Sequence, residues 1–328
     1  MKNFDIILVG DGLAARLLLY EMSQRQSFLD KKILQISSPI NFPDCSTRTT
    51  SVVSGGVHEK GISKLGDLLV DSYNSFTSFV KEYNDLGMFC EKSPQYYVFD
   101  EHMTEHKKEM FLKRFGHELE DFQHCKVASK QSYLVFPEIL LSFLKDLYVK
   151  KLNLTHVKET YIEHKESALR TDMSTYNGEK IILATGAYSS FFESSLDTKL
   201  GKAVSGSYLI WNNISLDIDN FVLSKGHFNL IHRKSKSELL FGGTSFEGHI
   251  HAHNLRELKS EFSLFKDMIN FDLDVDNANV ITGLRHKCSK RLPVCKRINT
   301  NTYVFSGFYK NGFTFPFYLK KILIDLLD

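Results

Sequence analysis

The chain has 328 residues, of which 42% are hydrophobic and 24% are charged, and its formal net charge is +2. This length favours two closely joined domains over one core, and the composition is typical of a soluble globular protein. The small net charge does not favour a nucleic-acid partner, and no apolar stretch reaches the roughly 18 residues that a membrane span needs. Five cysteines without a C-x-x-C pair predict reduced thiols and a cytoplasmic setting.

The chain opens with the pattern of a strand, a glycine turn and a helix. Residues 6–9 are a continuous apolar run, typical of a strand buried on both faces, and apolar residues at helical spacing begin at Leu13. Between them, Gly10 permits a tight turn, Gly12 lets the backbone approach a pyrophosphate, and Ala15 stands where a third glycine is commonest. The helix N-terminus would direct N–H groups at the phosphates. The pattern predicts dinucleotide binding.

A second buried strand is predicted at Lys32–Ser37. Nucleotide-binding folds usually end this strand with an acidic residue that holds the ribose hydroxyls. Ser37 and Ser38 take that place here, and their hydroxyls would bind a ribose more weakly. The following residues 45–58 are rich in hydroxyls and glycines, which can wrap an anion but also suit an ordinary polar loop.

The rest of the chain alternates between strands and helices. The apolar spacing predicts helices at 68–83, 139–148, 254–269 and from 316, and a surface helix within 101–123. It predicts strands at 96–99, 153–162 (a strand or hairpin), 180–186, 204–211, 227–232, 238–244, 279–285 and 302–307. The strands between 204 and 244 indicate an antiparallel sheet, and the absence of linkers predicts interleaved domains.

Five segments in chain order resemble the FAD-dependent amine and amino-acid oxidases of the D-amino-acid oxidase and glycine oxidase type. They are Gly10–Ala15, Ser51–Val57, Ile181–Tyr188, Thr282–Val294 and Gly307–Thr314. The second is similar to the family's small-residue segment along the flavin. The fourth resembles its G-[LIV]-R-P…D-x-x-P motif, and the fifth its G-[HF]-x-[RK]-N-G-[IF] closing loop.

The resemblance implies an α/β fold in which a Rossmann-type FAD-binding domain is interleaved with a substrate domain built on a mixed or antiparallel sheet. The expected FAD-binding domain comprises 1–75, 131–200 and 281–328, and the substrate domain 76–130 and 201–280. The FAD is expected to be noncovalent, because Cys288 does not match the family's attachment cysteine. The expected cofactor contacts are Gly10, Gly12, Ala15, Ser37, Ser38, Ser51, Gly55, Gly56, Thr185, Gly186, Gly307, Asn311, Gly312 and Phe313.

The resemblance also implies oxidation of the C–N bond of a carboxylate-bearing amine or amino acid, with hydride transfer to the flavin and reoxidation by O₂ or another acceptor. Arg285 would bind the substrate carboxylate, since a guanidinium grips a carboxylate with two parallel hydrogen bonds. Lys310 would stabilise the reduced flavin, Asn229 could hydrogen-bond the substrate, and His58 could face the flavin.

Several residues depart from the family pattern. His286 replaces the usual Pro, Lys290 replaces the Asp, and Ser37 replaces the acidic ribose ligand. These changes favour a substrate other than a standard small D-amino acid. They leave two alternatives open, a degenerate flavin-binding accessory protein and a flavin monooxygenase.

Two other groups of side chains have patterns that could form sites. A basic cluster leaves an anionic, tRNA-like substrate open, although a solvated face is the simpler interpretation; it consists of Lys287, Lys290, Arg291, Lys296 and Arg297. Alternating histidines could bind Zn or Ni, but no acidic or Cys ligand stands near them in sequence, so no metal site is predicted; they are His249, His251 and His253.

Overall fold

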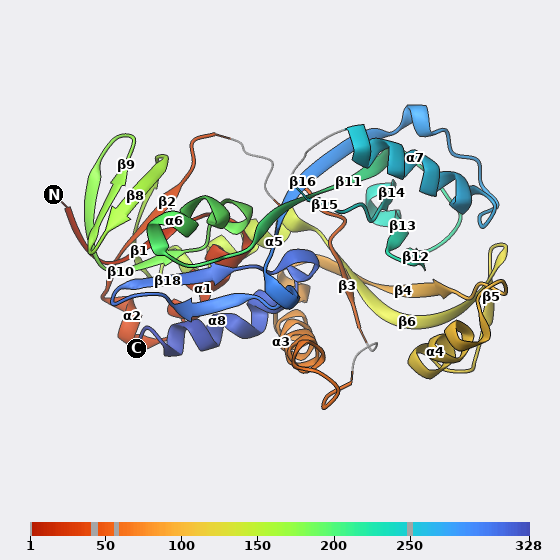
Figure 1. Cartoon of the computed structure of the whole chain (residues 1–328), viewed down its shortest axis with the longest axis horizontal. Helices are drawn as coiled ribbons and strands as arrows, with labels where there is room; N and C mark the ends of the chain where they lie inside the picture. Colours follow the sequence, from red (N-terminus) through yellow and green to blue (C-terminus); the bar gives the residue numbers. More distant parts are fainter. Residues whose placement is uncertain (1, 41–44, 56–58, 248–251) are drawn as a thin grey trace.

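A computed structural model describes residues 2–40, 45–55, 59–247 and 252–328, and the strands of these residues form two large sheets (Figure 1). The sheets occupy opposite ends of the molecule in this view, with helices α3 and α5 between them. This arrangement confirms the predicted α/β fold with a second, mixed sheet. No described helix is long and apolar enough to cross a membrane.

The first sheet has eight strands in the described residues, with the order β17-β18-β10-β1-β2-β7, with β9 paired to β10 and β8 paired to β9. It is parallel from β18 to β7, as expected of a Rossmann-type sheet. Ile7 and Leu8 of the central strand are fully buried, as the apolar run predicts. Its strands are β1 (Lys2–Val9), β2 (Lys32–Ser37), β7 (Asn153–Lys158), β8 (Tyr161–Lys165), β9 (Ala168–Thr171), β10 (Thr175–Leu183), β17 (Val294–Arg297) and β18 (Thr302–Ser306).

The second sheet has ten strands in the same described part of the chain, with the order β15-β11-β14-β13-β12-β4-β6-β3 and with β16 beside β11 and β5 beside β6. All its pairs are antiparallel except β12 with β4. Its strands are β3 (Val52–Ser54), β4 (Cys90–Val98), β5 (Glu120–Phe122), β6 (Cys125–Val135), β11 (Lys202–Asn212), β12 (Phe221–Lys225), β13 (Phe228–Arg233), β14 (Glu238–Gly242), β15 (Phe246–Glu247) and β16 (Asn279–Lys287).

The helices cover these sheets and join them. The α-helices are α1 (Leu13–Met22), α2 (Gln26–Leu29), α3 (Lys64–Gly87), α4 (Glu105–Phe115), α5 (Pro137–Tyr148), α6 (Glu193–Leu196), α7 (Ala252–Lys266) and α8 (Phe315–Asp325). Short 3₁₀ turns are η1 (Gly186–Phe192), η2 (Lys234–Lys236), η3 (Val275–Asn277), η4 (Ser289–Arg291) and η5 (Tyr309–Asn311).

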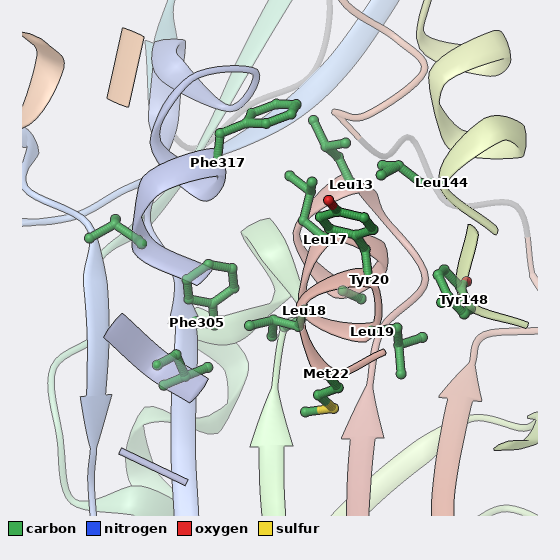
Figure 2. Packing of buried hydrophobic residues seen from close by; sticks show 14 of the residues in the cluster. Leu13, Leu17, Leu18, Leu19, Tyr20, Met22, Leu144, Tyr148, Phe305 and Phe317 are labelled. Carbon is green, nitrogen blue, oxygen red and sulfur yellow. The ribbon is translucent and has the colours of Figure 1, made fainter. Parts of the chain in front are cut away.

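Helix α1 is buried between the first sheet, α5 and α8 (Figure 2). Leu17 and Leu18 are fully buried there, beside Phe305 of β18 and Phe317 of α8. Burying each such side chain contributes about 1.5–3 kcal/mol to folding. The helix that begins at the glycine turn is therefore fixed on all sides by packing.

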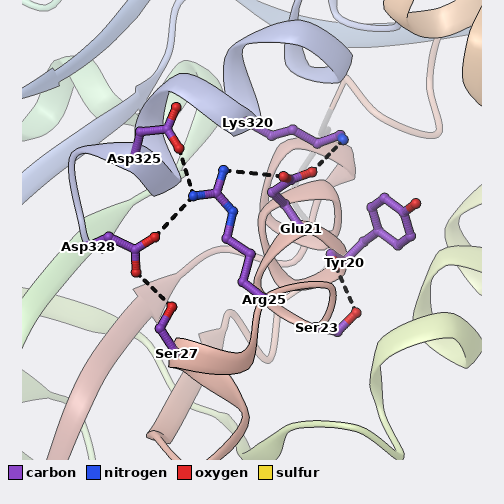
Figure 3. A network of polar contacts seen from close by, with 8 residues as sticks. All are labelled: Tyr20, Glu21, Ser23, Arg25, Ser27, Lys320, Asp325 and Asp328. Carbon is purple, nitrogen blue, oxygen red and sulfur yellow. Dashed lines mark hydrogen bonds and ion pairs between the residues drawn. The ribbon is translucent and has the colours of Figure 1, made fainter.

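A polar network ties the far end of α1 to α8 (Figure 3). The Lys320 ammonium lies 2.8 Å from a Glu21 carboxylate oxygen, and both residues are buried, at 5% and 8% exposure. Arg25 extends the network to Asp325 and Asp328, at 2.6 and 3.0 Å. Burial lowers the pKa of Lys320, while Glu21 opposes that change.

The predicted division into FAD-binding and substrate domains stays a prediction. Strands β3 and β16 lie largely within ranges expected for the FAD-binding domain, yet they pair within the ten-stranded sheet. The two sheets are thus joined by chain segments that cross between them several times.

Candidate active site

The glycine turn after β1 brings the backbone close to neighbouring strands. Gly10 has φ +131°, and a Cβ there would lie 2.5 Å from the carbonyl oxygen of Ala184. A Cβ on Gly12 would lie 2.8 Å from Ser46 Oγ. Position 10 therefore requires glycine, whereas a side chain at Gly12 would displace the Ser46 hydroxyl, and the two glycines leave bare backbone at the start of α1.

The N-terminus of α1 is available to an anion. Leu13 N donates to Ser46 Oγ at 3.1 Å, whereas the N–H groups of Ala14 and Ala15 have no partner within the helix by its geometry. The dipoles of these N–H groups and the positive end of the α1 helix dipole both point out of the helix N-terminus, toward the glycine turn. Ala15 itself is fully buried in the packing of α1.

A cavity of about 1470 Å³ runs from this turn to the ten-stranded sheet. It exceeds the ~300–1,000 Å³ of ordinary ligand pockets, so it can hold a dinucleotide and a substrate together. Residues 311–314 at the start of α8 also line it, so two helix N-termini face one cavity. The expected site residues that line it are Gly10, Gly12, Ser37, Ser38, Ser51, Thr185, Gly186, Asn229, Arg285, Gly307, Lys310, Asn311, Gly312 and Phe313.

Two of the expected site residues that the structure describes do not line this cavity. Ala15 packs behind the turn, and Gly55 lies against the Tyr73 ring. Gly56 and His58 lie outside the described residues. Their roles stay predictions.

Ser37 is buried at the end of β2, where the ribose ligand is expected. Its hydroxyl shares a 2.7 Å hydrogen bond with Nε2 of His156 on the adjacent β7. Burial lowers the pKa of His156, which favours the neutral ring. This contact could not be predicted from the sequence, because His156 reaches Ser37 only through the pairing of β2 with β7.

Arg285 on β16 lies in the cavity wall. Its Nη1 donates to the Thr244 carbonyl at 2.9 Å. A Cβ on Gly206 of the paired strand β11 would collide with the guanidinium, so glycine provides the space in which the guanidinium lies.

Lys310 extends into the same part of the cavity. Its Nζ lies 3.5 Å from the carbonyl oxygen of Gly243. The next carbonyl along the chain, that of Thr244, accepts the hydrogen bond from Arg285. Lys310 is exposed to the cavity, but partial loss of hydration there, and then the positive charges of Arg285 and Arg291, lower its pKa to about 8. The two predicted cations are thus brought together, and Arg291 joins them.

Asn229 belongs to a row of residues across the second sheet. Gly242, Asn229, Ser224 and Tyr97 pair successively on four adjacent strands, and all line the cavity. Ser224 Oγ donates to Asn229 Oδ1 at 2.6 Å, and Gln95 Nε2 donates to Ser224 Oγ at 2.9 Å. The Asn229 oxygen is therefore occupied, which leaves its Nδ2 as the donor for a ligand.

Gln95 and Ser224 were missed at the sequence level. They stand far apart in the chain, and the alternation of polar and apolar residues in their strands is typical of any half-buried sheet.

His286 joins the two sheets beside the cavity. Its Nδ1 shares a 2.7 Å hydrogen bond with Ser306 Oγ of β18, and burial lowers the pKa of the ring to about 4. The residue that departs from the family motif thus has a structural partner in this chain.

Cys288 is buried, with its Sγ 2.7 Å from the Leu200 carbonyl. Burial raises the pKa of this thiol to about 11, which makes it a poor nucleophile. Noncovalent attachment of FAD stays a prediction. No group of His, Cys, Asp and Glu side chains within the described ranges could hold a metal ion, and His249 and His251 lie outside those ranges.

A Rossmann-type sheet, a glycine turn that leads into a helix N-terminus, and a long cavity together define a dinucleotide-binding protein. The chain belongs to the FAD-dependent oxidoreductase family, whose model matches residues 140–326. The bound cofactor is therefore FAD, and the residues around the glycine turn fit its pyrophosphate. No curated protein sequence matches the chain.

Solved structures share the fold over almost the whole chain. Glycine oxidase from Geobacillus kaustophilus is similar with a TM-score of 0.76 at 14% identity, covering 100% of this chain and 95% of that one. L-α-glycerophosphate oxidase from Mycoplasma pneumoniae, solved with FAD bound, has a TM-score of 0.77 at 16% identity and the same coverage. L-proline dehydrogenase from P. horikoshii has a TM-score of 0.72 at 13% identity, covering 99% and 93%.

Proposed function

We propose that this enzyme oxidises the C–N bond of a carboxylate-bearing amine or amino acid. FAD supplies the hydride acceptor when it is bound. The observation that carries the proposal is the Arg285 guanidinium in the cavity wall, with Gly206 leaving space for it.

Arg285 binds the substrate carboxylate in this proposal. A planar guanidinium that is already held by the Thr244 carbonyl loses little freedom when it takes a carboxylate. Fixing the carboxylate fixes the adjacent carbon, and orientation of this kind supplies much of the rate in reactions that need no strong base.

Lys310 supplies positive charge where negative charge develops as the cofactor accepts electrons. Asn229 donates from Nδ2 to an oxygen of the substrate, because Ser224 and Gln95 hold its amide in that orientation. His58 stays a candidate for a contact with the flavin. A cytoplasmic location and O₂ or another molecule as electron acceptor also stay predictions.

An absorption spectrum of the purified protein tests the proposal first, since bound FAD gives a yellow protein. Anaerobic titration with a panel of D- and L-amino acids and secondary amines should then bleach the colour without NAD(P)H. Bleaching only by NAD(P)H would instead support a monooxygenase. Colourless protein that gains no thermal stability from added FAD would support an accessory protein.

A further inference from the structure

The charged residues of the cavity wall are divided between its two ends. The acids that line it are Asp11 and Glu159, both near the glycine turn and the end of β7. Asp11 is paired with Arg16 at 3.0 Å, and Glu159 accepts the hydroxyls of Thr171 and Tyr176. The end that faces the second sheet is lined by cations alone among the described charged groups; they are Arg114, Arg285, Arg291 and Lys310.

Arg291 is held in this wall by an unusual turn. Lys290 and Arg291 have φ values of +53° and +59°, a conformation that residues with a side chain adopt uncommonly. Arg291 lines the cavity, whereas Lys290, the preceding residue of the same turn, does not. No carboxylate in the described part of the chain forms an ion pair with Arg291.

The charges at this end exceed what a simple amino acid can balance. Under the proposed function, one carboxylate engages Arg285, and Lys310 faces the developing charge on the cofactor. Arg114 and Arg291 then remain, and Arg291 is close enough to Lys310 to lower its pKa. Glu257 also acts on Lys310, but it pairs with His227 at 3.7 Å and does not line the cavity.

We propose that the substrate carries a second acidic group, a carboxylate or a phosphate, and that Arg291 binds it. This inference rests on the proposed function for the reaction, and it adds the substrate class. The Nδ2 donor of Asn229 can bind an acceptor oxygen of the same substrate, whether that oxygen belongs to an acid or to an amide. Arg291 is thus a specificity residue, placed at the cavity by the turn at 290–291.

Amino acids that differ only in the second group test this proposal. Aspartate against asparagine, and glutamate against glutamine, compare a carboxylate with an amide of the same shape, while O-phosphoserine tests a phosphate. Both enantiomers of each are used with the FAD-loaded enzyme. We expect kcat/KM to be about tenfold or more higher for the acids, as one charge-assisted hydrogen bond provides.

Two variants of the turn provide the matched comparison. Arg291→Gln should lower kcat/KM for the acids about tenfold and leave the amides unchanged. Lys290→Gln, which removes the same charge one residue away, should leave both unchanged. The preference for acids should weaken with added salt, because Arg291 is exposed at the cavity.

A binding measurement tests the acid site without turnover. Succinate and its monoamide succinamate both carry one carboxylate for Arg285, and neither has an amine to oxidise. Thermal stabilisation of the enzyme should be stronger with succinate, and Arg291→Gln should abolish the difference.

The outcomes separate the two proposals. If kcat/KM is equal for acids and amides, or if Arg291→Gln lowers it equally for both, the proposal of a second acidic group is overturned. Amine oxidation then still stands. If no amine bleaches the flavin, the proposed reaction fails, and a retained preference for succinate would still support the acid site. Preference for O-phosphoserine over glutamate would identify the second group as a phosphate, and the reverse as a carboxylate.

Discussion

The two ends of helix α1 handle charge in opposite ways. At its far end, Lys320 and Glu21 are buried together, and Arg25 has carboxylate partners from the last residues of the chain. At its near end, α1 opens into a cavity whose opposite wall carries clustered cations. Paired charges fix the helix in place, whereas clustered cations are ready to bind a ligand that brings the opposite charge.

The largest effect is expected from breaking the buried pair. Lys320→Ala leaves the buried Glu21 carboxylate with only its 3.4 Å contact to Arg25. This should lower the free energy of unfolding by about 3 kcal/mol, the lower end of the effect of breaking a buried pair. Chemical denaturation measures this change. Lys321→Ala, one residue along on the exposed side, should change stability by less than about 0.5 kcal/mol. Equal effects of the two substitutions would show that the pair does not stabilise the fold.

The next largest effect is expected at the cavity. Arg285→Ala should raise KM for an oxidised amino acid about a hundredfold, because the carboxylate loses a charge-assisted, two-point contact. Steady-state kinetics on the FAD-loaded enzyme measures it. Arg170→Ala provides the control, since that arginine lies on β9 and pairs with Glu163. An unchanged KM in Arg285→Ala would remove this residue from the site.

Much of the fold could be predicted from the sequence. The strand at Lys32–Ser37 has the predicted limits, and the apolar run at 6–9 is the buried centre of β1. The segment 101–123 was harder, because α4 has no buried residue and the hairpin β5–β6 follows at once. Local periodicity is weak wherever an element has no side that faces a core.

The site was less predictable than the fold. Arg285 and Lys310 could be found because they stand within recognisable motifs. The contacts of Ser37 with His156, and of Asn229 with Ser224, depend on which strands are neighbours. Arg291 belongs to a basic cluster, and the turn at 290–291 distinguishes it, as a residue that lines the cavity, from Lys290, which does not.

A third test concerns the contact between the sheets. His286 has a pKa of about 4 when folded, against an ordinary value of 6.5, so the unfolded chain binds more protons between these pH values. The contribution of the neutral His286 ring to the free energy of unfolding should therefore be fully present above pH 6.5. As the pH drops to 4, the free energy of unfolding should fall by up to about 3 kcal/mol. His286→Asn should flatten that part of the curve. A slope identical to that of the parent would show that another group causes the acid loss.

The smallest effect is expected from titrating Lys310. Its pKa of about 8 means that the ammonium loses its charge as the pH rises through 8. We expect kcat/KM to fall about tenfold per pH unit above that value. Lys310→Arg should keep its charge and shift the decline to higher pH, whereas Lys310→Met should be slow at every pH. If the fall of kcat/KM at alkaline pH persists unchanged in Lys310→Met, the titration of another group causes it.

The carbonyls of Gly243 and Thr244 hold Lys310 and Arg285 respectively, and these two carbonyls are consecutive in the chain. One short stretch of main chain thus sets the spacing of both cations. Any tilt of that stretch would move the two side chains together, so under the proposed function a single substitution in it would affect both substrate binding and the charge near the cofactor.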